Sequence, residues 1–121
     1  MKSKKPSKQR KALFQAPMHR RHKFLSAHLA KDLIAKWKRR SLSLRTGDEV
    51  KVMRGKFKGT TGKISEVDLK RLKVYIENVK RRKVSGEEVH VPISPSNLLL
   101  TSPVMDDKER LAIVSRKGAK A

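Results

Sequence analysis

The 121-residue sequence contains no cysteine, few acidic residues and no long hydrophobic run. Without cysteine, disulfide bonds and thiolate metal sites are excluded, and a reducing compartment is compatible with the composition. No apolar run is long enough for a membrane span or a signal peptide, and no lipidation motif is present. Hydrophobic residues make up 36% and aromatic residues 4% of the chain. We therefore expect one small core with extensions outside it.

Positive charge is what the sequence has in excess. Thirty-two Lys and Arg face 11 Asp and Glu, which gives a formal net charge of +21. A free domain gains nothing from self-repulsion of this size, so we infer a polyanionic partner, and nucleic acid is favoured over an anionic membrane. Residues 1–44 carry fourteen cations against one acid, residues 45–85 thirteen against five, and residues 86–121 five against five. Anion binding is therefore expected in the first two thirds, and the C-terminal third is expected to be mainly architectural.

No group of residues predicts catalysis or a metal site. The acids, such as Asp48 and Glu77, occur singly on expected strand ends or exposed faces, and there is no phosphate-binding glycine loop followed by a helix. His19 and His22 have HxxH spacing, but no acidic or thiol ligand lies near them. Contact with phosphates or bases explains both histidines equally well. We expect no enzyme activity, no cofactor and no metal.

Residues 1–24 form a basic N-terminal arm with no amphipathic period. Lys and Arg recur every few positions, with Phe14, His19, His22 and Phe24 set among them. These aromatic and imidazole groups favour an arm that is extended when free and orders against a nucleic-acid backbone. The alternative is a solvated, disordered tail.

Residues 25–40 have the spacing of one amphipathic helix. Leu25, Leu29, Leu33 and Trp37 recur every four residues, and Ser26 is a suitable N-cap. The apolar stripe is expected to pack on the core. The cations of the last turn suit the negative end of the helix dipole, and they either contact RNA or remain solvated.

Residues 41–102 have the pattern of several short strands joined by tight turns. Leu42 and Leu44, then Val50 and Val52, alternate with polar residues. Further strands are expected over residues 62–67, 73–77 and 98–101, with a hairpin over residues 79–93. The strand over residues 98–101 is expected to close the sheet into a barrel. The connections leave no room for crossover helices, so we predict a mainly β fold, a small barrel. Residues 103–121 form a C-terminal tail in which residues 109–116 favour a short helix.

Between two of these strands, residues 54–59 form a loop in which Lys and Gly alternate. Gly55 and Gly59 are expected to supply backbone angles that other residues resist. Phe57 between them either stacks on a base or packs on the core.

The segment GDEVKVMRGKFKGTTGKI followed by VYIENV resembles a KOW motif. With KQRKALFQAPMHRRHKFLSAHLAKDL before it and VPISPSNLLLT after it, the chain resembles the archaeal–eukaryotic branch of the large-subunit ribosomal protein twenty-four family, over about residues 8–101. The resemblance implies an SH3-like barrel that binds large-subunit, 23S-type rRNA near its 5′ end. It also implies a role in early subunit assembly and a place near the peptide exit tunnel, on cytoplasmic ribosomes.

The partners expected are large-subunit rRNA and neighbouring ribosomal proteins; neither membrane insertion nor an obligate homo-oligomer is expected. The positions predicted to bind rRNA are the basic residues of the arm, of the end of the helix, of the glycine loop and of the hairpin: Lys8, Arg10, Lys11, His19, Arg20, Arg21, Lys23, Lys38, Arg39, Arg40, Arg54, Lys56, Lys58, Lys63, Arg81 and Arg82. The positions predicted to hold the motif's structure are Gly47, Asp48, Gly55, Gly59 and Gly62.

Two other classes of protein also fit a basic chain with this motif. A transcription-elongation KOW module would need an apolar patch for a polymerase and normally a second domain. A chromatin-type protein would prefer duplex DNA, and the glycine-punctuated strands argue against it.

Overall fold

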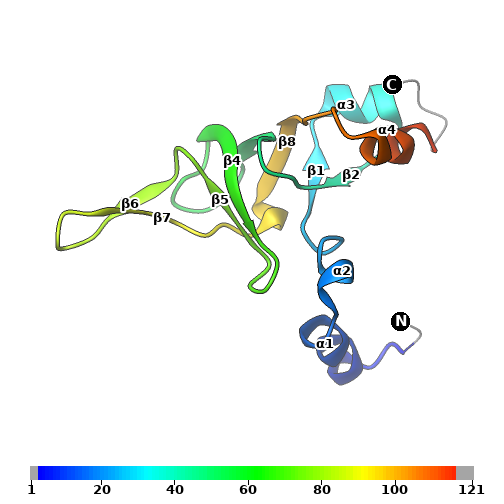
Figure 1. Ribbon diagram of the computed structural model, residues 1–121, viewed down its shortest axis with the longest axis horizontal. Helices are drawn as coiled ribbons and strands as arrows, with labels where there is room; N and C mark the ends of the chain where they lie inside the picture. Colours follow the sequence, from blue (N-terminus) through cyan, green and yellow to red (C-terminus); the bar gives the residue numbers. More distant parts are fainter. Residues whose placement is uncertain (1–2, 117–121) are drawn as a thin grey trace.

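The computed structural model describes residues 3–116, which form a mixed α/β fold with two projections (Figure 1). The elements in chain order are α1 (Pro6–Phe14), α2 (Met18–Arg21), β1 (Ser26–Leu29), α3 (Lys31–Trp37), β2 (Ser41–Ser43), β3 (Glu49–Val52), β4 (Thr61–Asp68), β5 (Lys73–Ile76), β6 (Lys80–Arg82), β7 (Glu88–His90), the 3-10 turn η1 (Pro95–Asn97), β8 (Leu98–Ser102) and α4 (Lys108–Ser115).

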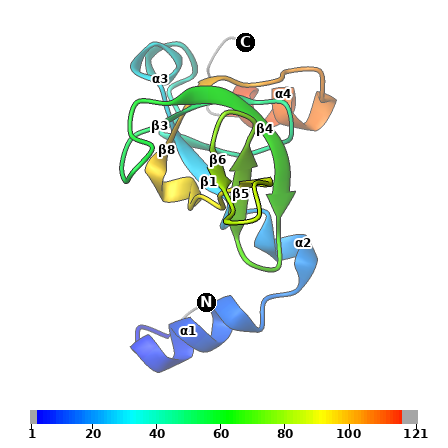
Figure 2. The same cartoon turned by 90° about the vertical axis from the view of Figure 1, so that its left-hand side faces the viewer.

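Six strands form one sheet in the order β2-β1-β8-β3-β4-β5. The last strand in sequence, β8, lies in the middle, parallel to β1 and antiparallel to β3. At the β5 edge, Val74 and Ile93 exchange two backbone hydrogen bonds of 2.9 Å each. Between residues 3 and 116 this is an open sheet, so the expected closed barrel is not formed. The sheet is nevertheless curved: the register of β4 shifts between Ile64 and Glu66, and Figure 2 shows β4 bending over the sheet.

The core is built from the alternating residues that the strand pattern singled out. Val50, Ile64, Val74, Ile76 and Leu100 are all at most 1% exposed. Each such side chain contributes about 1.5–3 kcal/mol relative to an exposed position. Leu69 and Leu72 of the β4–β5 turn pack against the same cluster. The sheet is thus a stable base for the projecting segments.

The prediction of one helix over residues 25–40 is wrong in its first half. Residues 26–29 are strand β1 of the sheet, and only Lys31–Trp37 is helical. Leu25, Ala27 and Leu29 are all 1% exposed while His28 is exposed, which is the two-residue period of a strand. A four-residue spacing of leucines fits both periods. Ser26 is therefore not an N-cap; Ala30 takes that position without a side-chain hydrogen bond.

The prediction of an extended arm is also wrong, because much of residues 3–24 is helical. Helix α1 begins with Pro6 in its first turn, where proline suits a helix, yet it buries no residue. Helix α2 is a single turn, likewise without a buried side chain. A helix that buries no side chain needs no apolar face. The apolar residues every three to four positions that identify most helices are therefore absent from these two.

The remaining predicted elements are confirmed, with small shifts at their ends. The entry strand β2, the turn at residues 46–47, strand β3, the glycine loop, the hairpin and β8 are present. The C-terminal helix predicted over residues 109–116 spans Lys108–Ser115. Asp107 caps it, its side chain accepting a 3.0 Å hydrogen bond from the Glu109 backbone.

Candidate nucleic-acid interface

Two segments project from the sheet, and both are rich in Lys and Arg. The arm with α1 and α2 extends from the start of β1, and the β6–β7 hairpin extends from a different side of the body (Figure 1). Of the sixteen positions predicted to bind rRNA, fourteen are exposed, and Arg21 and Arg39 are half-buried. The predicted positions are thus available on several elements and do not gather in one cleft.

Arg21 fixes the arm to the body. Its guanidinium donates to the Phe14 oxygen at 2.7 Å and the Ala16 oxygen at 3.0 Å within the arm. It also donates to the Leu69 oxygen at 3.4 Å and the Lys70 oxygen at 2.9 Å in the β4–β5 turn. A guanidinium offers five donors in a planar fork, which suits this role. Arg21 was predicted to bind rRNA; the structure gives its side chain a bracing role.

Arg39 is held in a similar way at the junction of α3 and β2. Its Nε donates to the Ser41 oxygen at 3.3 Å and its Nη1 to the Ile113 oxygen at 3.4 Å. The second contact reaches the C-terminal helix. The neighbouring Lys38 and Arg40 are exposed. Of the three cations predicted to bind rRNA at the helix end, Arg39 therefore holds the fold together, and Lys38 and Arg40 face solvent.

The glycine loop between β3 and β4 is a constrained turn, as predicted. Gly55 and Gly59 have φ of +95° and +90°, angles that side chains rarely adopt. The Gly59 amide donates to the Val52 oxygen at 2.8 Å, which joins the loop to β3. Lys56 and Lys58 are exposed on the loop, whereas Phe57 is half-buried against the core. Of the two predicted roles for Phe57, stacking on a base or packing on the core, the structure shows packing on the core.

Gly62 has a different role from the loop glycines. A Cβ at this position would lie 2.9 Å from Ile76 Cγ2 and 3.0 Å from Asn78 Nδ2. Gly62 faces Val50 across the β3–β4 ladder. It permits the close packing of β4 on the end of β5.

Asp48 is the predicted motif residue whose environment differs most from expectation. It was expected to be a single acid on a strand end, but it is fully buried. Its Oδ1 accepts a 2.7 Å hydrogen bond from Arg110 Nη1, and its Oδ2 accepts a second from Arg110 Nη2. The carboxylate also accepts from the backbone amides of Arg45 at 3.0 Å and Val104 at 2.9 Å. Four hydrogen bonds thus satisfy this buried charge.

Arg110 is a residue that sequence reasoning missed. It is 5% exposed on α4 and also donates to the Ser43 oxygen at 2.9 Å and the Val104 oxygen at 2.8 Å. No local pattern pairs residues 48 and 110, which lie 62 residues apart in the sequence. The contact with Ser43 also occupies one backbone carbonyl of β2, which is an edge strand of the sheet.

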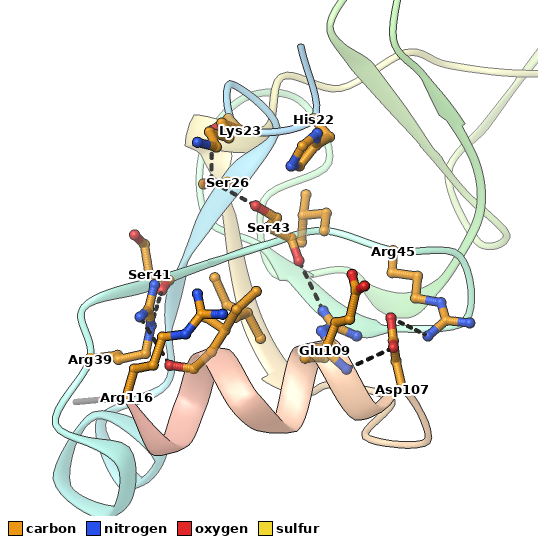
Figure 3. Close-up of a pocket in the computed structure, with 14 residues that line it drawn as sticks. His22, Lys23, Ser26, Arg39, Ser41, Ser43, Arg45, Asp107, Glu109 and Arg116 are labelled. Carbon is orange, nitrogen blue, oxygen red and sulfur yellow. Dashed lines mark hydrogen bonds and ion pairs between the residues drawn. The ribbon is translucent and has the colours of Figure 1, made fainter. Parts of the chain in front are cut away.

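A pocket of about 530 Å³ lies between β2 and α4, and Arg110 of this ion pair is among the residues that line it (Figure 3). Basic side chains from four segments line it: Lys23, Arg39, Arg45 and Arg116. Asp107 and Glu109 also line it, and Asp107 lies 3.5 Å from Arg45 in a half-exposed ion pair. The pocket is therefore lined by charges of both signs, whereas the arm carries positive charge.

The described residues contain no group of three or more His, Cys, Asp or Glu side chains that could hold a metal ion. His19 and His22 are both exposed on the arm. No helix within residues 3–116 is long and apolar enough to cross a membrane.

Comparison with known proteins shows the family to which the chain belongs. Residues 3–117 match the family of ribosomal proteins that comprises eukaryotic L26 and archaeal L24p. The large ribosomal subunit protein uL24 of Methanosphaera stadtmanae is 46% identical over 115 residues, which cover 95% of this chain and 98% of that protein. The large ribosomal subunit protein uL24 of Korarchaeum cryptofilum is 46% identical over 120 residues, covering 99% and 92%. The chain therefore belongs to this archaeal and eukaryotic family of large-subunit ribosomal proteins, which are structural proteins and not enzymes.

Proposed function

We propose that the chain is a structural component of the large ribosomal subunit that binds large-subunit rRNA near its 5′ end. In this proposal it promotes an early step of subunit assembly and lies near the peptide exit tunnel. Family membership supports the large subunit as its place, and the resemblance of the motif and its flanks supports the finer statements. Its partners are then rRNA and the neighbouring ribosomal proteins.

The observation that carries RNA binding is the distribution of charge over the fold. The fourteen exposed positions among those predicted to bind rRNA occur on the arm, the α3–β2 connection, the glycine loop with the start of β4, and the β6–β7 hairpin. Lys and Arg that neutralise phosphates release counterions, which supplies affinity with little sequence discrimination. Because these side chains lie on several separate segments, they suit a folded RNA whose strands approach the protein from more than one side.

We also propose that the curved sheet is the protein's form of the SH3-like KOW barrel. The glycine loop between β3 and β4, the bent strand β4 and the bridge from Val74 to Ile93 at the sheet edge support this. A barrel closed at that edge would hold the projecting segments at fixed angles. An experimental structure on the subunit, showing continuous pairing beyond Ile93, would decide this point.

Crosslinking of the protein to large-subunit rRNA tests the proposed function. Photoreactive groups at Lys8, Lys56 and Arg81 report on three separate segments, and sequencing of the crosslinked RNA locates each contact. We expect the three sets of crosslinks to lie in the 5′ region of the rRNA. Crosslinks scattered over the whole rRNA would contradict a specific site near the 5′ end. A control group at Glu77, which lies at an exposed position after β5, measures background labelling.

A further inference from the structure

The β6–β7 ribbon, residues 80–90, is a two-stranded sheet that pairs with no other strand of the described chain. At its base, Nδ1 of His90 lies 3.2 Å from the Ile76 oxygen of β5. Its register pairs Lys80 with His90, Arg81 with Val89 and Arg82 with Glu88. Figure 1 shows it projecting from the body, and every residue from 80 to 88 is exposed. A two-stranded hairpin without a buried face is only marginally stable in water. We therefore expect a partner to stabilise the ribbon.

The charge on β6 is divided between the two faces of the ribbon. Successive residues of a strand point to opposite faces, so Lys80 and Arg82 lie on one face and Arg81 on the other. Cross-strand partners share a face, which places His90 and Glu88 with Lys80 and Arg82, and Val89 with Arg81. Both faces thus present cations, although Glu88 offsets part of the charge on the first. A ribbon that rested on one RNA surface would use the cations of only one face.

The tip of the ribbon carries the most exposed large hydrophobic residue within residues 3–116. Val84 is 108% exposed, and the turn around it is closed by hydrogen bonds from Lys83 to the Glu87 oxygen at 2.7 Å and from Gly86 to the Lys83 oxygen at 2.9 Å. Its side chain contributes nothing to the protein's own core. On an RNA partner, the Val84 side chain can make an apolar contact with a base or a ribose, beyond the phosphate groups.

We propose that the β6–β7 ribbon inserts between two separate segments of rRNA, with Arg82 and Lys80 facing one backbone and Arg81 facing the other. This rests on the proposed RNA-binding function and deepens it by naming the RNA arrangement that the ribbon fits. Two phosphate backbones that approach each other repel, and cations on both faces of a thin ribbon reduce that repulsion for both at once. Val84 then makes the innermost contact.

Arg81 and Arg82 form a matched pair for the test. They are adjacent, chemically identical and exposed in the same strand, but they face opposite sides. Full-length R81Q and R82Q proteins are compared with wild type for binding to the large-subunit rRNA, with hydroxyl-radical footprinting of each complex. We expect each change to lower the slope of log affinity against log salt by about 1, because each removes one phosphate contact. Each variant should also lose backbone protection at its own, separate stretch of RNA.

Three outcomes contradict the proposal and leave the proposed function standing. If only one variant changes the salt slope, the ribbon lies on a single RNA surface. If both lose protection at the same nucleotides, one RNA segment runs along the outer edge of β6. If neither variant changes the slope while wild type binds, the ribbon does not contact RNA. Failure of wild type to bind at all would instead contradict the proposed function.

A third variant tests the tip separately from the charges. V84S keeps the charge and removes most of the apolar surface. We expect weaker binding with an unchanged salt slope, because no phosphate contact is lost. Wild-type affinity for V84S would show that the tip remains in solvent, which would overturn the insertion.

Discussion

The guanidinium of Arg110 and the carboxylate of Asp48, 62 residues apart in the sequence, form a doubly hydrogen-bonded ion pair in the interior of the protein. Asp48 is fully buried and Arg110 is 5% exposed. The pair ties the turn before β3 to helix α4. The C-terminal segment is thereby part of the fold, and Val114 of the same helix is fully buried.

Removing Arg110 should strongly destabilise the protein. R110Q leaves the Asp48 carboxylate buried without its countercharge, and we expect the free energy of unfolding to fall by about 3–5 kcal/mol. Urea denaturation followed by circular dichroism measures this. R110K keeps the charge but loses the planar fork, so an intermediate loss is expected. R116Q, an exposed change next to the same helix, should alter stability by about 0.5 kcal/mol or less. A loss under about 1 kcal/mol for R110Q would show that the pair does not hold α4.

Arg21 should act by positioning the arm and not by its charge alone. R21Q removes hydrogen bonds to four backbone carbonyls, two in the arm and two in the β4–β5 turn. We expect proteolysis within residues 17–24 to become faster. We also expect the affinity for rRNA to fall. The loss should be larger than the loss of one phosphate contact explains, a contact that changes the slope of log affinity against log salt by about 1.

R20Q is the matched control, because Arg20 is the exposed neighbour. It should change the salt slope by a similar amount and leave the proteolysis rate unchanged. Equal behaviour of R20Q and R21Q in both measurements would remove the bracing role.

The two kinds of glycine in the motif predict two different failures. G59A meets no atom within 4 Å but requires a side chain at φ +90°, which costs about 1–2 kcal/mol and displaces the loop. G59N should cost less, because Asn tolerates such angles better than Ala. G62A has the opposite problem: its Cβ meets Ile76 at 2.9 Å, so β5 must shift, at about 1–3 kcal/mol. Thermal unfolding of the three variants checks that G59N loses less stability than G59A and that G62A is also destabilised. A G59A protein with full stability and full rRNA affinity would refute the backbone argument for Gly59.

Local patterns predicted the strands well because their signal is local. Val50, Val52, Val74 and Ile76 alternate with polar neighbours, and the structure buries all four. Residues 25–29 were misassigned because leucines four apart satisfy both a helix and a strand, and only the burial of Ala27 against the exposure of His28 distinguishes them. Helix α1 escaped notice because it buries nothing.

Tertiary relationships had no signal in the sequence. The Asp48–Arg110 pair, the Arg21 brace and the parallel pairing of β1 with β8 each join segments far apart in the chain. The central position of β8 was likewise not predictable from its apolar run Leu98–Leu100, which was expected only to complete a barrel. The basic positions were predicted because exposure of Lys and Arg is their ordinary state. Which of them brace the fold, as Arg21 and Arg39 do, required the structure.

The central claim is that exposed cations on several segments bind rRNA, and the arm outside the core is the longest of these segments. Its most direct test is the salt dependence of rRNA binding for the whole chain and for a variant without residues 1–16. The deletion removes six Lys and Arg residues and leaves Arg21 bonded to the β4–β5 turn. Helix α1 buries no residue, so the thermal unfolding of the body should not change. If at least half of the six cations contact phosphates, the slope of log affinity against log salt falls by about 2–5. An unchanged slope with an intact fold would contradict the account.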